Sequence, residues 1–197
     1  APPPPPCILP MDPPRHLTEC SPLNRRETGM RLERDWAPWF APDLRWRVEK
    51  SPVNLTRMRL LQQLFPMAQF VVMLRHPEAV AASVASWVDA APGALIDHWI
   101  AAQAQMLADL PHLHAVMVLR YEDVTAEPDR ALRRIAAFLD LPPAALPEGI
   151  GDGNRAYEGA ERMTAGQALE AARWGYGPGL SVGPWEGLVQ HLPTIHL

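Results

Sequence analysis

Two short apolar runs, each followed by a helical pattern, constrain the fold of this chain more than any other feature. The runs are QFVVML (69–74) and HAVMVLRY (114–121), and continuous apolar and β-branched segments of this length are typical of strands buried on both faces. Apolar residues recur at helical spacing over 77–87, 95–110 and 129–141. Strands that alternate with helices predict an α/β fold with a central parallel sheet covered on both sides.

The N-terminal part has a different character. It begins APPPPPC and continues through LPMDPPRH, and proline at this density favours extended chain over helix or central strand. We therefore expect a flexible arm over residues 1–34 and a folded domain over residues 35–197. A short strand is expected at Arg45–Lys50, and Asn54 is expected to cap a helix that ends before Pro66. The glycine-rich C-terminal part predicts mostly loop, with a short helix at 165–174.

Composition excludes some classes of protein. A chain of 197 residues, 48% of them hydrophobic, has enough apolar material for one globular core. The formal net charge of −4 does not indicate a nucleic-acid partner. No apolar run has the length of a membrane span and no signal-like segment is seen, so we expect no membrane span in this chain. Two cysteines, Cys7 and Cys20, do not define a disulfide framework.

Polar side chains are expected at the carboxyl edge of the sheet, where open parallel sheets bind ligands. Arg75 is the first residue past the strand at 69–74. Ser83 follows on the second turn of the next helix, on the same face as Val80 and Trp87. A hydroxyl on a packed face needs a partner, because an unpaired buried polar group costs about 1–3 kcal/mol. Arginine and a hydroxyl beside a helix N-terminus favour a phosphate-like ligand.

A structural interpretation of the same residues stays open. In it, Arg75 pairs with Glu78 or Asp123, and the Ser83 hydroxyl bonds back to its own helix. Neither side chain would then be available to a ligand.

The order of motifs across residues 48–141 resembles the sulfotransferases that use 3′-phosphoadenosine 5′-phosphosulfate (PAPS) as donor. The chain has a helix ending in Leu-Phe-Pro, then a strand, then an arginine that opens a helix with a serine eight residues later. Tyr-Glu-Asp follows another strand, and a proline-opened helix then ends in Phe-Leu. The segment SVGPW (181–185) adds a further similarity. The resemblance implies a three-layer, P-loop NTPase-like sulfotransferase fold with a central parallel sheet, incomplete at the N-terminus.

The resemblance also implies a nucleotide site. Arg75 and Ser83 would bind the 3′-phosphate, which distinguishes PAPS from ordinary adenine nucleotides. Tyr121 is similar to a family tyrosine near the adenine, and the alternative is an ordinary aromatic residue at a strand end. Gly183 and Trp185 fall in a segment similar to the one that closes over the nucleotide, where glycine would allow close approach of the backbone to phosphate.

Lys50 is the candidate catalytic residue. In some Golgi-type members a lysine at this place lies near the transferred sulfuryl group, and an ammonium there stabilises the negative charge that spreads over the oxygens. The alternative is a surface lysine paired with Glu49. Glu122 and Asp123 are expected to organise the sheet edge. Asn54 also begins a glycosylation sequon, although capping is the more economical interpretation. No histidine has metal-ligand spacing, so no metal is expected.

The sequence departs from the family upstream of Val48. The resemblance implies a glycine-rich loop with Lys and Ser/Thr that holds the 5′-phosphosulfate, and no such loop is found there. The usual general base comes from the same region, and none of its candidates is in a recognisable context: His16, Glu19, Glu27 and Glu33. Three explanations are open. In the first, the chain is a fragment or truncated gene model, which the start at Ala1 favours. In the second, it is a nucleotide-binding relic, and in the third, another segment replaces the loop.

Two functional hypotheses follow. The first is a PAPS-dependent sulfotransferase that acts on a hydroxyl or amine acceptor, with no nucleic acid and no metal. The Glu-Lys-Ser-Pro form at 49–52 favours carbohydrate or protein tyrosine over small phenols as acceptor. The second is an inactive or truncated sulfotransferase-like module that binds a nucleotide or a protein. The Golgi-type resemblance favours the Golgi lumen over the cytoplasm.

Overall fold

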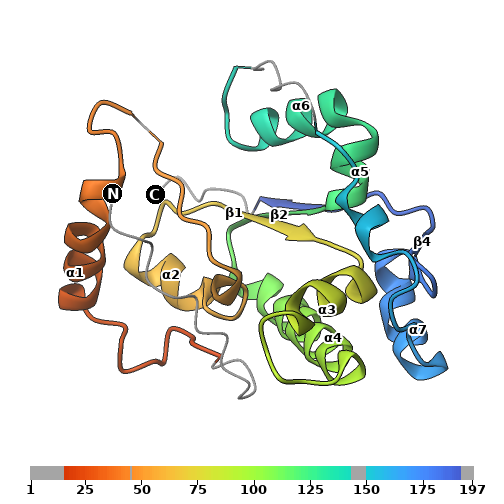
Figure 1. The fold of residues 1–197 in the computed structure, drawn as a ribbon. Helices are drawn as coiled ribbons and strands as arrows, with labels where there is room; N and C mark the ends of the chain where they lie inside the picture. The colour runs from red at the N-terminus through yellow and green to blue at the C-terminus, as the bar shows by residue number, and fades with distance from the viewer. Residues whose placement is uncertain (1–15, 45, 143–149, 192–197) are drawn as a thin grey trace. The chain divides into compact units, whose positions relative to one another are not determined.

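The structure is a computed structural model that describes residues 16–44, 46–142 and 150–191. It divides into two compact units, one of residues 1–68 with 105–113 and one of residues 69–104 with 114–197. Figure 1 labels the helices and strands. Cys7 and Arg45, which entered two of the expectations above, lie outside the described residues, and Cys20 is a free, exposed thiol.

The second unit contains the sheet. Its described strands run in the order β1 (Phe70–Leu74), β2 (Ala115–Arg120) and β5 (Leu188–His191). β1 and β2 are parallel, so both carboxyl ends reach the same edge, with Leu74 opposite Arg120. The expected parallel α/β arrangement is confirmed for these two strands. β5 pairs antiparallel with β2, which makes the sheet mixed.

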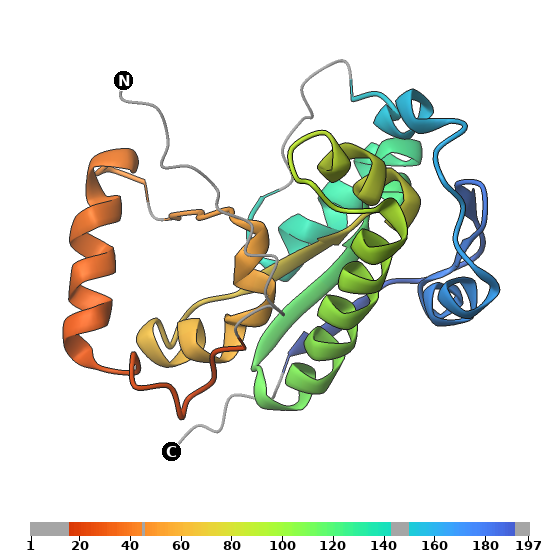
Figure 2. The ribbon, with the colours of Figure 1, turned by 60° about the horizontal axis from the view of Figure 1, so that its bottom comes forward.

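Helices cover both faces of this sheet and give three layers (Figure 1). One face carries α5 (Tyr121–Ala126) and α6 (Pro128–Phe138), and on it Ala115, Met117 and Leu119 of β2 form a buried cluster with Phe138. The other face carries α3 (Pro77–Ala85) and α4 (Pro92–Asp109), and Figure 2 shows α4 running along the sheet. The helices expected in these regions are confirmed, and a proline opens α3, α4 and α6 because its fixed φ suits the first helical turn.

The strand β1 differs from its expected burial. Val72 and Leu74 are buried, but Val71 and Met73 are 40% and 48% exposed. The expectation of burial on both faces is therefore wrong for β1 and correct for β2, whose six residues are all buried. The reason is position: β1 is at the edge of the described sheet, whereas the α6 cluster covers β2.

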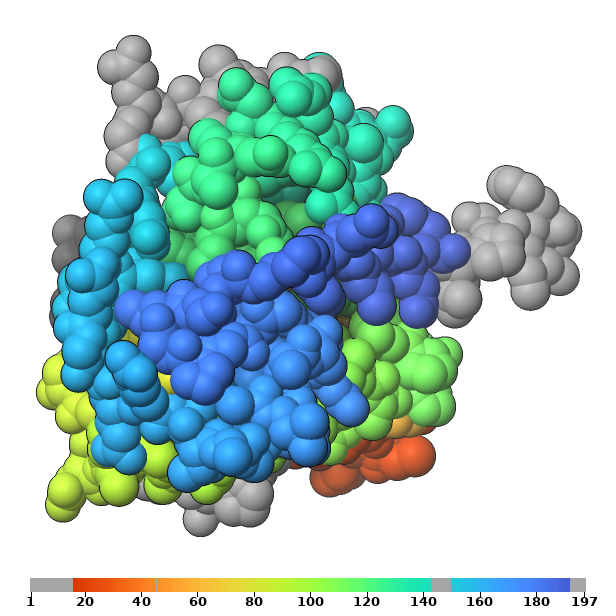
Figure 3. Space-filling model, turned by 90° about the vertical axis from the view of Figure 1, so that its right-hand side faces the viewer, coloured from red at the N-terminus to blue at the C-terminus, as the bar shows by residue number. Residues whose placement is uncertain are grey.

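The C-terminal part of the second unit is more ordered than the expected loop. After η4 (Gly153–Tyr157), α7 (Ala165–Ala171) and η5 (Ala172–Trp174) confirm the short helix expected at 165–174. A hairpin of β3 (Tyr176–Gly177) and β4 (Ser181–Val182) follows. Figure 3 shows the chain from β4 to β5, in dark blue, running between the surface of α5 and α6 and the surface of α7.

The first unit contains α1 (Arg26–Trp36), η1 (Ala37–Trp39), η2 (Pro52–Thr56), α2 (Met58–Leu64) and η3 (Leu110–His112). The expectation that folded chain begins near Asp35 is wrong, because α1 begins nine residues earlier in a stretch without proline. The strand expected at 45–50 is also absent from residues 46–50, which lie between Pro42 and the proline that opens η2.

Asn54 does not cap a helix as expected. It lies inside η2, and Arg57 occupies the N-cap position of α2. Its side-chain amide donates a hydrogen bond to the Glu49 carboxylate, and Thr56, the third residue of the sequon, is only 4% exposed.

A charge network joins the start of the described chain to α2 and to the end of α4 within the first unit. His16 Nε2 lies 2.9 Å from the fully buried carboxylate of Asp109, and Arg59 lies 3.6 Å from the same carboxylate. Arg59 also pairs with Glu19 and thereby holds the pKa of that carboxyl below its usual value. Two of the four residues weighed as general bases therefore already have partners: His16 contacts Asp109 and Glu19 pairs with Arg59.

Candidate functional site

Arg75 follows directly on β1 and precedes α3, at the carboxyl edge of the sheet. Its side chain is half-buried, and its Nε donates a 2.7 Å hydrogen bond to Asn154 Oδ1. The guanidinium carbon lies 4.8 Å from the centre of the Tyr121 ring and 5.4 Å from that of Tyr157. Within the described ranges, neither terminal nitrogen of Arg75 takes part in a hydrogen bond or an ion pair. The guanidinium is therefore held by a neutral amide and two rings.

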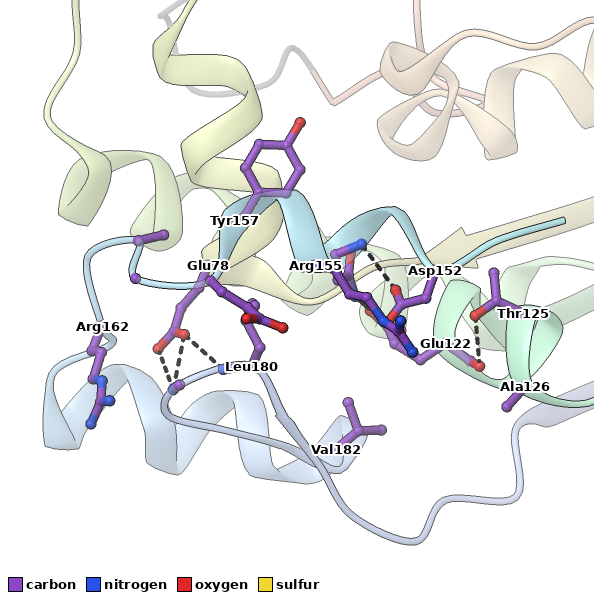
Figure 4. Close-up of a pocket in the computed structure, with 15 residues that line it drawn as sticks. Glu78, Glu122, Thr125, Ala126, Asp152, Arg155, Tyr157, Arg162, Leu180 and Val182 are labelled. Atoms are coloured by element: carbon purple, nitrogen blue, oxygen red, sulfur yellow. Dashed lines mark hydrogen bonds between the residues drawn. The ribbon is translucent and has the colours of Figure 1, made fainter.

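The ion pairs of the structural interpretation are not formed. Glu78 is 1% exposed and accepts hydrogen bonds from the backbone amides of Met163, Gly179 and Leu180. Figure 4 shows its carboxylate directed at the turn that contains Leu180. Asp123 pairs with Arg120 at 2.7 Å. Both carboxylates weighed as partners of Arg75 are thus engaged elsewhere.

Glu122 organises the sheet edge, as expected. Its Oε1 accepts hydrogen bonds from the His76 backbone amide at 2.9 Å and from Asn154 Nδ2 at 2.7 Å. Its Oε2 accepts from the Tyr176 hydroxyl at 2.8 Å. Burial, and next the charge of Glu122, raise the pKa of Tyr176 far above its usual value, so this hydroxyl stays protonated and acts as a donor. Glu122 therefore links three segments rather than acting as a free base.

His76 is a core residue. It is fully buried, its Nδ1 accepts from the Glu78 amide at 3.2 Å, and its Nε2 lies 2.9 Å from the Gly177 carbonyl. Burial lowers its pKa, so the neutral ring with a proton on Nε2 satisfies both contacts. His76 thus caps α3 and ties it to β3.

Ser83 lies on α3 and is half-buried, but not in the expected environment. The helix ends at Ala85, and Trp87, expected on the same packed face, is 74% exposed. In the described part of the chain, no hydrogen bond joins the Ser83 hydroxyl to Arg75 or to its own helix; only its carbonyl accepts one, from Ser86 Oγ at 2.7 Å. Its role in binding phosphate stays a prediction.

Tyr121 begins α5 directly after β2 and does more than an ordinary aromatic residue at a strand end. Its ring lies against Arg75, and its hydroxyl donates to the Gly151 carbonyl at 2.9 Å while accepting from the Gly153 amide at 2.8 Å. A Cβ on Gly153 would lie 3.1 Å from this hydroxyl and 3.4 Å from Arg75 Nη2. The backbone of η4 thus comes close to both side chains at Gly153, and a Cβ there would displace them by a few tenths of an ångström.

Gly183 and Trp185 surround a second arginine. Arg120 is 3% exposed and donates to the Gly183 carbonyl at 2.9 Å and to the Trp174 carbonyl at 3.1 Å. Its guanidinium carbon lies 5.4 Å from the centre of the Trp185 ring. The Gly183 amide donates to the Gly175 carbonyl at 2.7 Å. This amide already has an acceptor, so the contact of Gly183 with phosphate stays a prediction.

Lys50 belongs to the first unit and is exposed. The alternative partner, Glu49, accepts from Asn54, and no ion pair between Glu49 and Lys50 is present among the described residues. Its catalytic role stays a prediction. No group of three or more histidine, cysteine or acidic side chains in the described residues could hold a metal ion.

An open cleft of about 770 Å³ lies next to the residues that contact Arg75. It includes Asn154 and Glu122 in its wall but neither Arg75 nor Ser83. The acidic and basic side chains that line it come mainly from η4 and its surroundings and are Glu78, Glu122, Asp152, Arg155, Glu158 and Arg162 (Figure 4). We place the candidate anion site at Arg75 rather than in this mixed-charge cleft, because the arginines of the cleft are exposed and carboxylates lie in the same wall.

Sequence reasoning missed Asn154 and Tyr157. Both contact Arg75 from η4, although Asn154 is 79 residues away from Arg75 along the chain. The local signal is an aspartate that caps a short turn, since Asp152 Oδ1 accepts from the Asn154 amide at 2.9 Å. Such a turn indicates a defined loop but does not indicate which residue it meets.

Comparisons with known proteins bear on the family and the fold. Residues 14–145 match the model of the family described as "Sulfotransferase family". No curated protein matches the chain. Among solved structures, the fold is similar to the "Sulfotransferase Domain from the Curacin Biosynthetic Pathway", with a TM-score of 0.51 and 16% sequence identity over 77% of this chain and 68% of that chain.

In the described ranges, no helix has both the length and the apolar character needed to cross a bilayer. The family match extends over more than half of the chain and includes β1, Arg75, α3 and β2. The protein therefore belongs to the sulfotransferase family.

Proposed function

We propose that this protein transfers a sulfuryl group from PAPS to a hydroxyl or amine acceptor, with a carbohydrate or a protein tyrosine favoured. In this reaction the acceptor oxygen or nitrogen forms a bond to sulfur as the bond between sulfur and the phosphate oxygen breaks. The acceptor loses a proton, and adenosine 3′,5′-bisphosphate leaves. The Golgi lumen remains the proposed compartment.

The observation that carries this proposal is the state of Arg75. Its guanidinium lies at the carboxyl edge of a parallel strand pair and contacts an amide and two rings, while no carboxylate of the described residues pairs with it. The two terminal nitrogens of an arginine without a carboxylate partner suit a dianionic phosphate, which accepts paired hydrogen bonds from a guanidinium. The adjacent N-terminus of α3 adds a favourable field for an anion.

Family membership supports the sulfuryl chemistry, and the resemblance assigns the remaining roles. Ser83 would add a hydroxyl to the 3′-phosphate, and Tyr121 and the segment of Gly183 and Trp185 would complete the nucleotide site. Lys50 would stabilise the negative charge on the moving sulfuryl oxygens.

A second candidate function is a nucleotide-binding module without activity. It is favoured by one sequence observation: residues 1–47 contain no glycine-rich loop with Lys and Ser/Thr. Binding and turnover separate the two functions.

The test has two parts. Titration calorimetry compares adenosine 3′,5′-bisphosphate with AMP on the wild-type chain and on Arg75→Ala, and a turnover assay follows release of the bisphosphate from PAPS with a phenol, a tyrosine peptide and an oligosaccharide. We expect the bisphosphate to bind at least about tenfold more tightly, which is about 1.4 kcal/mol, with the difference lost in Arg75→Ala. Equal affinities in the wild type would refute the anion site. Preference without turnover would support the binding module.

A further inference from the structure

Arg75 is held at one edge by a side chain from a distant segment. Its Nε donates at 2.7 Å to Asn154, which is 5% exposed. The guanidinium thereby has a fixed direction, since Nε and the terminal nitrogens lie in one rigid plane. The terminal nitrogens are the only donors of Arg75 that stay available within the described residues.

Asn154 separates this cation from a carboxylate. Its Oδ1 accepts from Arg75, and its Nδ2 donates at 2.7 Å to Glu122 Oε1. Its own backbone amide donates to Asp152 at 2.9 Å, which fixes the turn. A neutral amide in this position orients Arg75 without neutralising it, whereas a carboxylate there would form an ion pair with the guanidinium and compete with an incoming anion.

Tyr157 restricts the same guanidinium from the other end of η4. Its ring centre lies 5.4 Å from the guanidinium carbon, and the Tyr121 ring lies at 4.8 Å. Figure 4 shows Asp152, Arg155 and Tyr157 following one another along this short segment. Ring contacts of this kind favour one orientation of arginine and leave its planar edge free.

We infer that Asn154 and Tyr157 are positioning residues of the anion site. Together they hold Arg75 so that its terminal nitrogens point to the ligand with their charge uncompensated. This inference rests on the proposed function, because it assigns to η4 the task of preparing Arg75 for the 3′-phosphate. It makes selectivity for a 3′-phosphorylated nucleotide depend on two residues that the motifs around Arg75 do not include.

The experiment measures the ratio of the Kd for AMP to the Kd for adenosine 3′,5′-bisphosphate by titration calorimetry. We expect Asn154→Asp to lower this ratio about tenfold or more, because it replaces a neutral acceptor with an ion-pair partner. Asn154→Ala and Tyr157→Leu should each lower it about threefold to tenfold by releasing the guanidinium. Tyr157→Phe keeps the ring and is the matched control, with a ratio within about twofold of the wild type.

A merely structural role would have a different signature. If these residues only support the fold, the variants weaken AMP and the bisphosphate equally, the ratio stays constant, and the inference is wrong. The proposed function fails separately, when the wild type itself shows no preference for the bisphosphate, and the inference then fails with it. Circular dichroism and melting temperature identify variants that do not fold. If Asn154→Asp does not fold, Asn154→Ala and Tyr157→Leu become the deciding variants.

Discussion

Gly175→Ala tests how the segment of Gly183 and Trp185 is held in place. Gly175 has a φ of +75°, a conformation that costs a residue with a Cβ about 1–2 kcal/mol. A Cβ there would lie 2.5 Å from Arg120 Nη1, 3.0 Å from the Gly183 carbonyl oxygen and 3.2 Å from the Pro184 carbonyl oxygen. Two of these three contacts are with backbone, which cannot turn aside as a flexible side chain can.

The arginine cannot withdraw without loss either. Arg120 is bonded to Asp123 and to the carbonyls of Trp174 and Gly183, and hydrogen bonds of charged groups contribute about 1.5–3 kcal/mol each. Conformational strain and one broken contact together predict a loss of about 2.5–5 kcal/mol for Gly175→Ala. This is a large share of the stability of a typical domain.

The assay is urea unfolding followed by tryptophan fluorescence, with the free energy of unfolding extrapolated to water. Gly177→Ala, two residues further along the chain, is the matched control, because its Cβ would meet Ser181 at an ordinary 3.5 Å and its φ is not positive. We expect the control to lose less than about 1 kcal/mol. Equal losses in the two variants, or a loss below about 1 kcal/mol in Gly175→Ala, would refute the reasoning.

Three further perturbations test the network around Glu122 and Arg120. Burial lowers the pKa of His76 in the folded state. Its contribution to stability should therefore be fully present above about pH 6.5 and be lost as pH falls below that value. Urea titrations at pH 7.5 and 5.0 should show this loss, reduced in His76→Asn; an identical pH dependence in both proteins contradicts it. Tyr176→Phe leaves Glu122 Oε2 without its hydroxyl donor and should cost about 1–3 kcal/mol in the same assay, whereas unchanged stability would mean that water replaces the hydroxyl. Asp123→Ala leaves the buried Arg120 without its ion-pair partner; we expect a loss of about 1–3 kcal/mol by thermal unfolding, below that of a fully buried pair because Asp123 is 41% exposed, and no shift in melting temperature would argue against this role.

The parts of the fold that the sequence predicts correctly are those with strong local periodicity. The strand β2 and the helices α3, α4 and α6 fall close to their expected positions, because an apolar run or a helical stripe marks each one. The strand β5 was not expected. Its four residues carry little pattern, and it forms by pairing with β2 across about 70 residues of chain.

The errors in the N-terminal part also have a local cause. Proline dominated the expectation there, although the stretch of α1 contains none, and the short strand expected at 45–50 does not form over residues 46–50. Propensity describes a segment alone, and tertiary packing can override it.

The candidate site was predicted in part. Arg75 and Tyr121 were expected at the sheet edge, and the structure brings them into contact. Asn154 and Tyr157 could not be found, because no local pattern states that η4 returns to Arg75. Expecting Trp87 on a packed face failed because α3 ends two residues before it.

A crystal structure of the protein with adenosine 3′,5′-bisphosphate would show directly where the 3′-phosphate binds. We expect it within about 3 Å of both terminal nitrogens of Arg75, with Asn154 still bonded to Nε. A 3′-phosphate bound away from Arg75, for example in the cleft at Arg155 and Arg162, would contradict it.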